Sequence, residues 1–194
     1  MVALGAGNGT DAGNLIDEIY ESGVVSGDTR GAVMGGITRD SGDGYIRYAY
    51  DDVDYHEFHT SNNAADFGEL SVGTYHGAGC ASTTRWVFKS GHRYTSAEGN
   101  VHHIHMDYWT AASLGNASDF GDVSNRTQYL SGMADGTRGE WWGGMDASGT
   151  TQGAKTDAIA YITIASTGDG TDAGNLHYGT SLVFGENGLS GAAS

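Results

Sequence analysis

Apolar and polar residues alternate in short stretches of this chain, and the alternation is clearest around three tyrosines. These stretches read Val53-x-Tyr55, Met106-x-Tyr108 and Ile159-x-Tyr161. A period of two places successive side chains on opposite faces of a strand, so each stretch predicts a strand, and we expect the three tyrosines to share one buried layer. No segment combines the period of an amphipathic helix with capping residues. The pattern therefore predicts an all-β chain.

One short sequence motif occurs four times, and its spacing indicates an internal repeat. It has the form Asp-x-Gly followed by a polar and an aliphatic residue, and it begins at Asp11, Asp66, Asp119 and Asp172, which are 55, 53 and 53 residues apart. A Thr-Arg pair follows each of the first three aspartates after 18 residues. A period of this size is typical of stacked or radially arranged supersecondary units.

The repeat predicts how the whole chain is organised. We expect one β-repeat domain over residues 1–194, with a partial repeat at 1–28, repeats at 29–83, 84–136 and 137–189, and a short tail at 190–194. This gives about three and a half repeats of roughly four strands each. The segment from each aspartate to Thr-Arg keeps its length, whereas the following segment varies by two residues. That difference predicts a packed hairpin and an exposed loop.

The four aspartates are expected to form structural turns. An aspartate carboxylate accepts hydrogen bonds from nearby backbone N–H groups, and the glycine two residues later supplies unusual dihedral angles. We therefore expect Asp11, Asp66, Asp119 and Asp172 to act in the fold, at corners between strands.

Composition and charge narrow the classes of function. The chain has 33 glycines and no proline, which favours tight turns and close backbone contacts. Its net charge of −15 repels phosphate groups, so we expect no nucleic-acid binding and no docking on an anionic membrane. No stretch is long and apolar enough for a membrane span or a secretion signal, so membrane insertion is not expected. The single cysteine, Cys80, excludes an intramolecular disulfide, and its small neighbours indicate burial.

The repeat resembles a known kind of module. A Thr-Arg strand ending in paired glycines, a variable loop, a tyrosine-centred strand and an Asp-Phe-Gly corner are similar to the kelch-type blade of β-propellers. The amino-acid sequence of residues 161–172 and 78–85 is still more similar to repeats in virion proteins of marine bacteriophages, which are labelled tail-fibre or structural. The resemblance implies a β-propeller-like or related threefold β-repeat assembly. Propellers close with four to eight blades, so the open strand edges left here predict a homo-oligomer.

The same resemblance implies a function. It predicts a non-enzymatic virion protein, a tail or head fibre or decoration component that contacts a host-surface glycan. Its expected partners are copies of itself, other virion proteins and that glycan; no cofactor is expected, and its expected location is the virion, after assembly in the host cytoplasm. Two alternatives stay open: a cement protein that stabilises a capsid or tail without binding a host molecule, and an enzyme on a propeller scaffold, either a hydrolase or a copper oxidase. The sequence has no nucleophile elbow, phosphate loop or dinucleotide fingerprint, which favours a protein that is not an enzyme.

Aromatic residues in and near the variable loops are the candidate ligand contacts. Flat aromatic faces beside Asp, Asn and His are typical of surfaces that bind sugars. The candidates are Tyr45, Tyr48, Trp86, Tyr94, Trp109 and Trp142. The alternative is that they pack in the core or between subunits, as we expect for Trp141, which aligns with Val33 and Phe88.

Two groups of residues have side chains of the kind that bind metal ions. On a strand, His103, His105 and Asp107 share one face, and imidazoles two residues apart can share zinc or copper. Only one repeat carries these residues, so a solvated polar face is favoured. The acidic loop at 40–44 offers carboxylates to calcium but lacks a full ligand pattern, so an ordinary acidic loop is favoured there too.

Overall fold

The computed structural model describes residues 11–39, 47–95, 99–146 and 154–177, and these contain strands and no helix. The predicted all-β fold is confirmed. In keeping with this, the described ranges include no helix long and apolar enough to cross a membrane.

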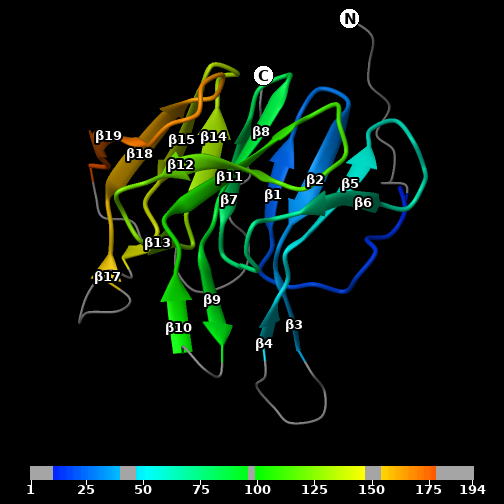
Figure 1. Ribbon diagram of the computed structural model, residues 1–194, viewed down its shortest axis with the longest axis horizontal. Helices are drawn as coiled ribbons and strands as arrows, with labels where there is room; N and C mark the ends of the chain where they lie inside the picture. Colours follow the sequence, from blue (N-terminus) through cyan, green and yellow to red (C-terminus); the bar gives the residue numbers. More distant parts are fainter. Residues whose placement is uncertain (1–10, 40–46, 96–98, 147–153, 178–194) are drawn as a thin grey trace, which may run out of the picture.

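Twelve of the strands form three antiparallel sheets of the same design (Figure 1). In each sheet the chain forms the strands in spatial order, from the first to the fourth, which we call the outer strand. The first sheet contains β1 (Gly23–Ser26), β2 (Arg30–Met34), β5 (Asp52–Glu57) and β6 (Ala65–Glu69). The second contains β7 (Ala78–Ala81), β8 (Arg85–Lys89), β11 (His105–Thr110) and β12 (Ser118–Asp122). The third contains β14 (Ser131–Ala134), β15 (Arg138–Trp142), β18 (Ala158–Thr163) and β19 (Thr171–Asn175).

A hairpin is inserted between the second and third strands of every sheet. These hairpins are β3 (Ile37–Arg39) with β4 (Arg47–Ala49), β9 (His92–Thr95) with β10 (Gly99–His102), and β16 (Met145–Asp146) with β17 (Ala154–Lys155). The short strand β13 (Thr127–Gln128) pairs with β16. The hairpins β3–β4 and β9–β10 extend to the bottom of Figure 1, and β17 of the third hairpin lies at its lower left. We call this side of the molecule the hairpin side. They occupy the segment whose variable length predicted a loop.

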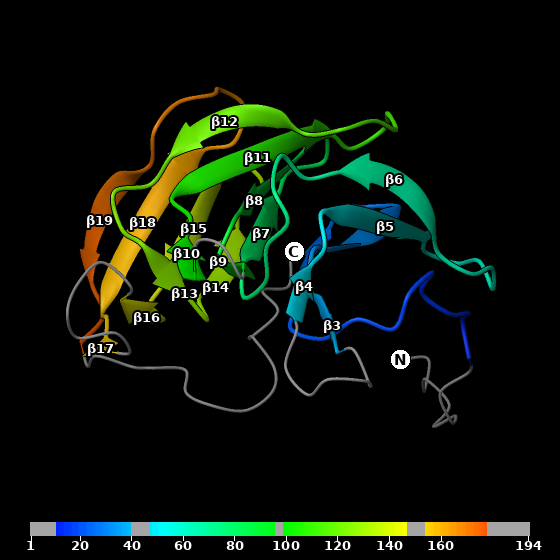
Figure 2. The same cartoon turned by 60° about the horizontal axis from the view of Figure 1, so that its bottom comes forward.

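The three sheets lie side by side (Figure 2). Their first strands are neighbours, with β7 between β1 and β14. Two apolar clusters fill the spaces between them. One lies between the first and second sheets and includes Met34, Val53, Phe67, Trp86 and Trp109. The other lies between the second and third sheets and includes Val87, Met106, Phe120, Trp141 and Ile164. Burying a large apolar side chain contributes about 1.5–3 kcal/mol, so contacts between sheets supply the main stabilisation.

The tyrosines of the third strands are half-buried, whereas a fully buried layer was expected. In each sheet the arginine of the Thr-Arg pair lies over the tyrosine ring. The distances from guanidinium carbon to ring centroid are 4.9 Å for Arg30 and Tyr55, 4.5 Å for Arg85 and Tyr108, and 3.7 Å for Arg138 and Tyr161. The ring must stay near the surface because its face binds a charged group, as in other cation–π pairs.

The recurring aspartates lie inside the outer strands, which differs from the expected corner between strands. Asp66, Asp119 and Asp172 belong to β6, β12 and β19, each opposite a register shift in the neighbouring third strand. The glycines two residues later have φ angles of 144°, 137° and 108°. Such dihedrals accommodate the extra residue of a bulge, so the strand continues where a turn was expected. The sheets therefore begin one strand before Thr-Arg, at Gly23, Ala78 and Ser131.

Candidate functional site

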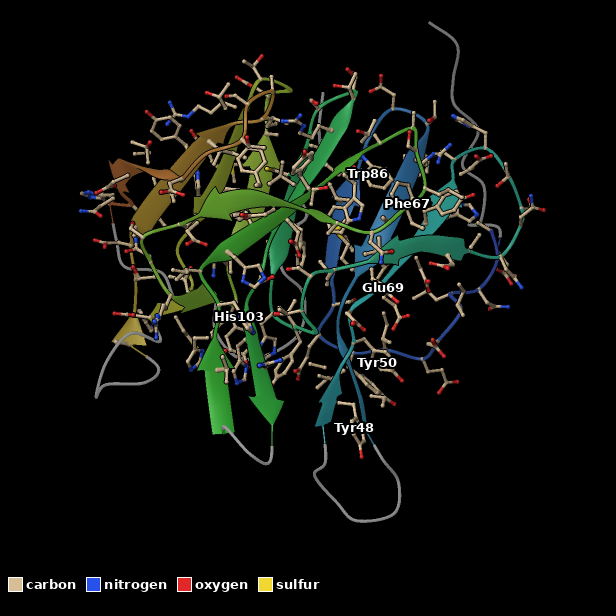
Figure 3. The ribbon with its side chains drawn as sticks, viewed as in Figure 1. Tyr48, Tyr50, Phe67, Glu69, Trp86 and His103 are labelled. Atoms are coloured by element: carbon tan, nitrogen blue, oxygen red, sulfur yellow. The ribbon has the colours of Figure 1, made fainter. Side chains whose placement is uncertain are left out.

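An aromatic ring is strongly exposed on the hairpin side. Tyr48 on β4 is 58% exposed and pairs across the hairpin with Thr38 (Figure 3). Its neighbour Tyr50 is half-buried, and the backbone of Tyr50 is bonded to Gly36 and Thr74 at 2.8 Å and 3.0 Å. These bonds fix the base of the hairpin. A flat ring on a fixed base is able to stack on an apolar ligand face without losing much conformational entropy.

Five histidines gather beside the second hairpin, and we call them the histidine group: His76, His92, His102, His103 and His105. The rings of His76 and His92 stack with centroids 5.9 Å apart, and those of His92 and His102 with centroids 4.9 Å apart. The rings of His103 and His105 meet edge to face at 5.0 Å. These residues come from the segment before the second sheet, from both strands of the hairpin, and from the start of β11, so only the folded chain brings them together.

Two members of the histidine group, His102 and His103, are held largely in the neutral form near pH 7. Burial, with His105 as the next cause, lowers the pKa of His103 to about 4. Burial also lowers the pKa of His102, helped by the positive charges of Lys89 and Arg126. A neutral imidazole both donates and accepts a hydrogen bond, which suits recognition of hydroxyl groups. His76 Nε2 lies 2.8 Å from Glu21 Oε2, so one member also has a carboxylate partner.

A buried lysine lies beneath this side of the second sheet. The ammonium group of Lys89 donates a hydrogen bond to the carbonyl oxygen of Thr127, and burial lowers the pKa of Lys89 to about 7. No sequence pattern predicted this burial, because a lysine at the end of a strand normally extends into water.

The candidate metal triad does not converge. Asp107 is 1% exposed and points between the first two sheets, where its Oδ2 accepts hydrogen bonds from the backbone N–H and the hydroxyl of Ser71, both at 2.9 Å. His105 Nε2 lies 3.2 Å from the hydroxyl of Ser90. His103 precedes β11, so it does not share the strand geometry assumed from the sequence. Among the described residues, no group of three or more His, Cys, Asp or Glu side chains is arranged to hold a metal ion. The acidic loop at 40–44 lies outside the described residues.

Two of the six candidate ligand contacts are core residues, so their assignment from the sequence was wrong. Trp86 is 0% exposed and Trp109 is 3% exposed, and the two face each other across β8 and β11. The ring of Trp86 lies 5.0 Å from that of Phe67, which belongs to the first sheet (Figure 3). The second sheet is covered on both faces, so an aromatic residue on its strands is buried whichever way it points.

The remaining candidates differ in position. Trp142 is half-buried on the third sheet, and its Nε1 donates a hydrogen bond to Glu140 Oε2 at 2.8 Å. Trp141 beside it is buried, as expected from its alignment, and donates to the carbonyl oxygen of Ala78 at 2.9 Å. Tyr45 lies outside the described residues, and Tyr94 lies in β9 with its side chain outside them. Among the candidates whose side chains are described, only Tyr48 is strongly exposed.

A groove of about 650 Å³ runs along the first strands of all three sheets and over the outer face of the first sheet. Its lining includes Val24, Val25, Phe58, Cys80 and Met133 and is mainly apolar. Cys80 is buried, and burial raises the pKa of its thiol, so this thiol stays protonated and unreactive. The groove depends on three separate repeats, which is why periodicity alone did not predict it.

Comparisons with known proteins identify a fold and no family. No protein-family model matches the chain, and neither does any curated protein. Among solved structures, the chain is similar to one titled "Structure of YjhT", with a TM-score of 0.61 and 11% sequence identity. The match covers 82% of this chain and 53% of that one, so the chain spans about half the length of that structure. At this identity the likeness describes the fold alone.

Proposed function

We propose that the chain is a structural component of a phage particle, a tail or head fibre or decoration protein, whose hairpin side contacts a host-surface glycan. The observation that carries the proposal is the gathering of all three hairpins on one side, with the exposed ring of Tyr48 among them. The resemblance of the repeats to those of marine phage virion proteins supports the same assignment. The protein would act in the virion, without a cofactor and without catalysis.

The finer fold belongs to the same proposal. We infer that the three sheets are kelch-like blades in a propeller-like arrangement, with a partial repeat before the first. Their common strand order and the match to about half of a longer chain support this reading. Copies of the chain would associate, because a half-built ring leaves open strand edges.

Binding would be multivalent. One tyrosine ring stacked on a sugar, with neutral imidazoles near its hydroxyl groups, gives a weak contact. Several copies in one oligomer raise the effective concentration, so that weak contacts add to firm attachment. Other virion proteins would anchor the oligomer to the particle.

An array of bacterial-surface glycans, probed with the purified protein, tests this function. We expect binding that Tyr48→Ala reduces at least about tenfold, since stacking on one aromatic ring contributes on the order of 1 kcal/mol per contact and several contacts act together. Leu114→Ala is the matched control, because Leu114 is 59% exposed but lies in the turn between β11 and β12. If no glycan on the array is bound, and deletion of the gene makes the particle less stable, the alternative function as a cement protein would be favoured.

A further inference from the structure

The first two sheets are joined at the outer strand by a specific backbone contact. The loop between β11 and β12 lies along β6, where the N–H of Gly115 donates to the carbonyl oxygen of Phe67 and the N–H of Ala117 to that of Glu69, both at 2.8 Å. A Cβ atom on Gly68 would overlap the carbonyl oxygen of Gly115. Glycine in the receiving strand is therefore required for this contact, which we call the outer-edge contact.

The second and third sheets are joined in the same way. The loop between β18 and β19 lies along β12, where the N–H of Gly168 donates to the carbonyl oxygen of Phe120 and the N–H of Gly170 to that of Asp122, both at 2.7 Å. A Cβ atom on Gly121 would overlap the carbonyl oxygen of Gly168. The outer-edge contact is thus a repeated feature.

A third contact of this kind uses residues 11–15, which belong to none of the three sheets. The corresponding loop of the first sheet lies along them: the N–H of Ala64 donates to the carbonyl oxygen of Asn14 at 2.8 Å, and the N–H of Asn14 donates to Asn63 Oδ1 at 3.1 Å. Gly13 has a φ of 128°, and a Cβ atom on it would overlap the carbonyl oxygen of Asn62. Residues 11–15 therefore stand in the place of an outer strand.

A buried carboxylate accompanies two of these contacts. Asp107 on β11 accepts the N–H of Ser71, five residues after Asp66, and Asp54 on β5 accepts the N–H of Ile16 at 3.3 Å, five residues after Asp11. The segment after the receiving strand is thus held by the third strand of the next sheet.

The fourth receiving strand, β19, has the right conformation, and no loop of the described ranges lies against it. Its Gly174 has a φ of 108°, and a Cβ atom on it would meet nothing within 4 Å in the part of the chain that the structure describes. The sequence around it is nearly that of the first receiving segment, since residues 168–176 and 7–15 are identical at eight of nine positions. Two segments of the same sequence therefore fit the same loop of the first sheet.

We propose that copies of the chain join head to tail, with the loop at 62–64 of one copy docked on β19 of the next in place of its own residues 11–15. Residues 11–15 are then an internal competitor that weakens self-association. This inference rests on the self-association included in the proposed function, and it names the surface that would be used.

Apolar surface is present on both sides of this junction. Val24 and Phe58 are exposed around the first sheet. On the third sheet Trp142 and Ile159 are cross-strand partners on the face opposite Trp141, away from the second sheet. Docking would bury part of both surfaces.

The junction between copies would differ from the internal ones near the first strands. Gly79 and Gly132 let the preceding first strand approach closely, because a Cβ atom at either position would overlap a carbonyl oxygen of that strand. Val24 occupies the equivalent position in the first sheet. The contact between copies is therefore made mainly at the outer strands.

The test compares association of the full chain with that of a variant lacking residues 1–15, by light scattering and native mass spectrometry over a concentration series. We expect the apparent Kd for self-association to fall at least about tenfold on deletion, because an intramolecular competitor is removed. Gly13→Ala in the full chain should act in the same direction without any deletion, because the added methyl group disfavours docking of residues 11–15. A synthetic peptide of residues 7–16 should inhibit association of the shortened variant.

Gly174→Ala in the shortened variant should weaken self-association again, since the added methyl group would overlap the docked loop. Gly136→Ala is the matched control: Gly136 has a φ of 87° in the turn between β14 and β15 of the same sheet, and its added Cβ atom also meets nothing within 4 Å. Association that neither deletion nor Gly174→Ala changes would overturn the proposed junction while leaving self-association intact. A monomer at every concentration for all variants would overturn the junction and self-association together.

Discussion

The outer strands β12 and β19 share the Asp-x-Gly sequence and have different surroundings. In both, the aspartate carboxylate accepts the N–H of the glycine two residues later, at 3.0 Å for Asp119 and 2.7 Å for Asp172. In both, that glycine has a positive φ. Gly121 lies under the loop of the next sheet, whereas Gly174 has open space above it within the described residues. The Asp-x-Gly sequence is therefore enough to set the local conformation, and only the following sheet decides whether the strand is covered.

Replacing a tryptophan at a covered position and one at the open face should give the largest difference in stability. Trp86→Ala removes a fully buried ring between two sheets and should lower the free energy of unfolding by about 3–5 kcal/mol. Trp142→Ala, on the half-buried face of the third sheet, should cost about 1 kcal/mol. Urea unfolding monitored by circular dichroism measures both. Equal losses would mean that the third sheet is as fully covered as the second.

Substitutions of Gly121 and Gly174 distinguish the cost of local backbone strain from the cost of displacing a docked loop. Alanine at either position adopts an unfavourable positive φ, at a cost of about 1–2 kcal/mol. Gly121→Ala must also displace the carbonyl oxygen of Gly168, so we expect it to cost roughly 2 kcal/mol more than Gly174→Ala. Chemical denaturation of both variants in one buffer checks the difference. Similar midpoints would show that the loop moves aside easily.

The sequence predicted the strands well because each depends on nearby residues. Alternation around Tyr55 and its equivalents is a local signal, and the all-β fold follows from it. The fixed spacing from Asp66 to Thr-Arg predicted a packed hairpin, which was wrong, because this segment contains β6 and β7 of two different sheets. Trp86 and Trp109 were misassigned because burial on both faces of β8 depends on two other sheets. The histidine group and the groove combine residues from separate repeats, and the pattern of one repeat contains no information on such combinations.

Lys89 and Trp142 occupy equivalent positions, at the ends of β8 and β15, but only Lys89 lies in a sheet that is covered on both faces. The stability contributed at the covered position should therefore depend on pH. Burial lowers the pKa of Lys89 to about 7, whereas an unfolded lysine titrates near 10.4. Between these values the unfolded chain binds more protons, so the free energy of unfolding should rise with pH, by at most about 1.4 kcal/mol per unit.

Lys89→Met should remove this rise between pH 7 and pH 9 and should stabilise the fold at pH 7 by about 2 kcal/mol. Lys155→Met is the control, since Lys155 is exposed on β17 and should leave the pH profile unchanged. Thermal unfolding at several pH values measures the profiles. A rise between pH 7 and pH 9 that Lys89→Met leaves unchanged would assign it to a group other than Lys89. The lowered pKa values of His102 and His103 change stability only below about pH 6.5.

The carboxylate contacts should give the smallest effect, and they differ among the sheets. Asp107 accepts two hydrogen bonds from Ser71, Asp54 accepts one from Ile16, and Ala160 occupies the same position in the third sheet. Asp107→Ala should therefore cost about 1–2 kcal/mol, and Asp54→Ala less than about 1 kcal/mol. Asp107→Asn keeps an acceptor oxygen and should recover part of the loss.

Burial raises the pKa of Asp107, so the folded chain binds the extra proton and its stability should fall as pH rises from the ordinary aspartate pKa through the raised one. The asparagine variant should lack that fall, and a variant that kept it would assign the titration to another carboxylate.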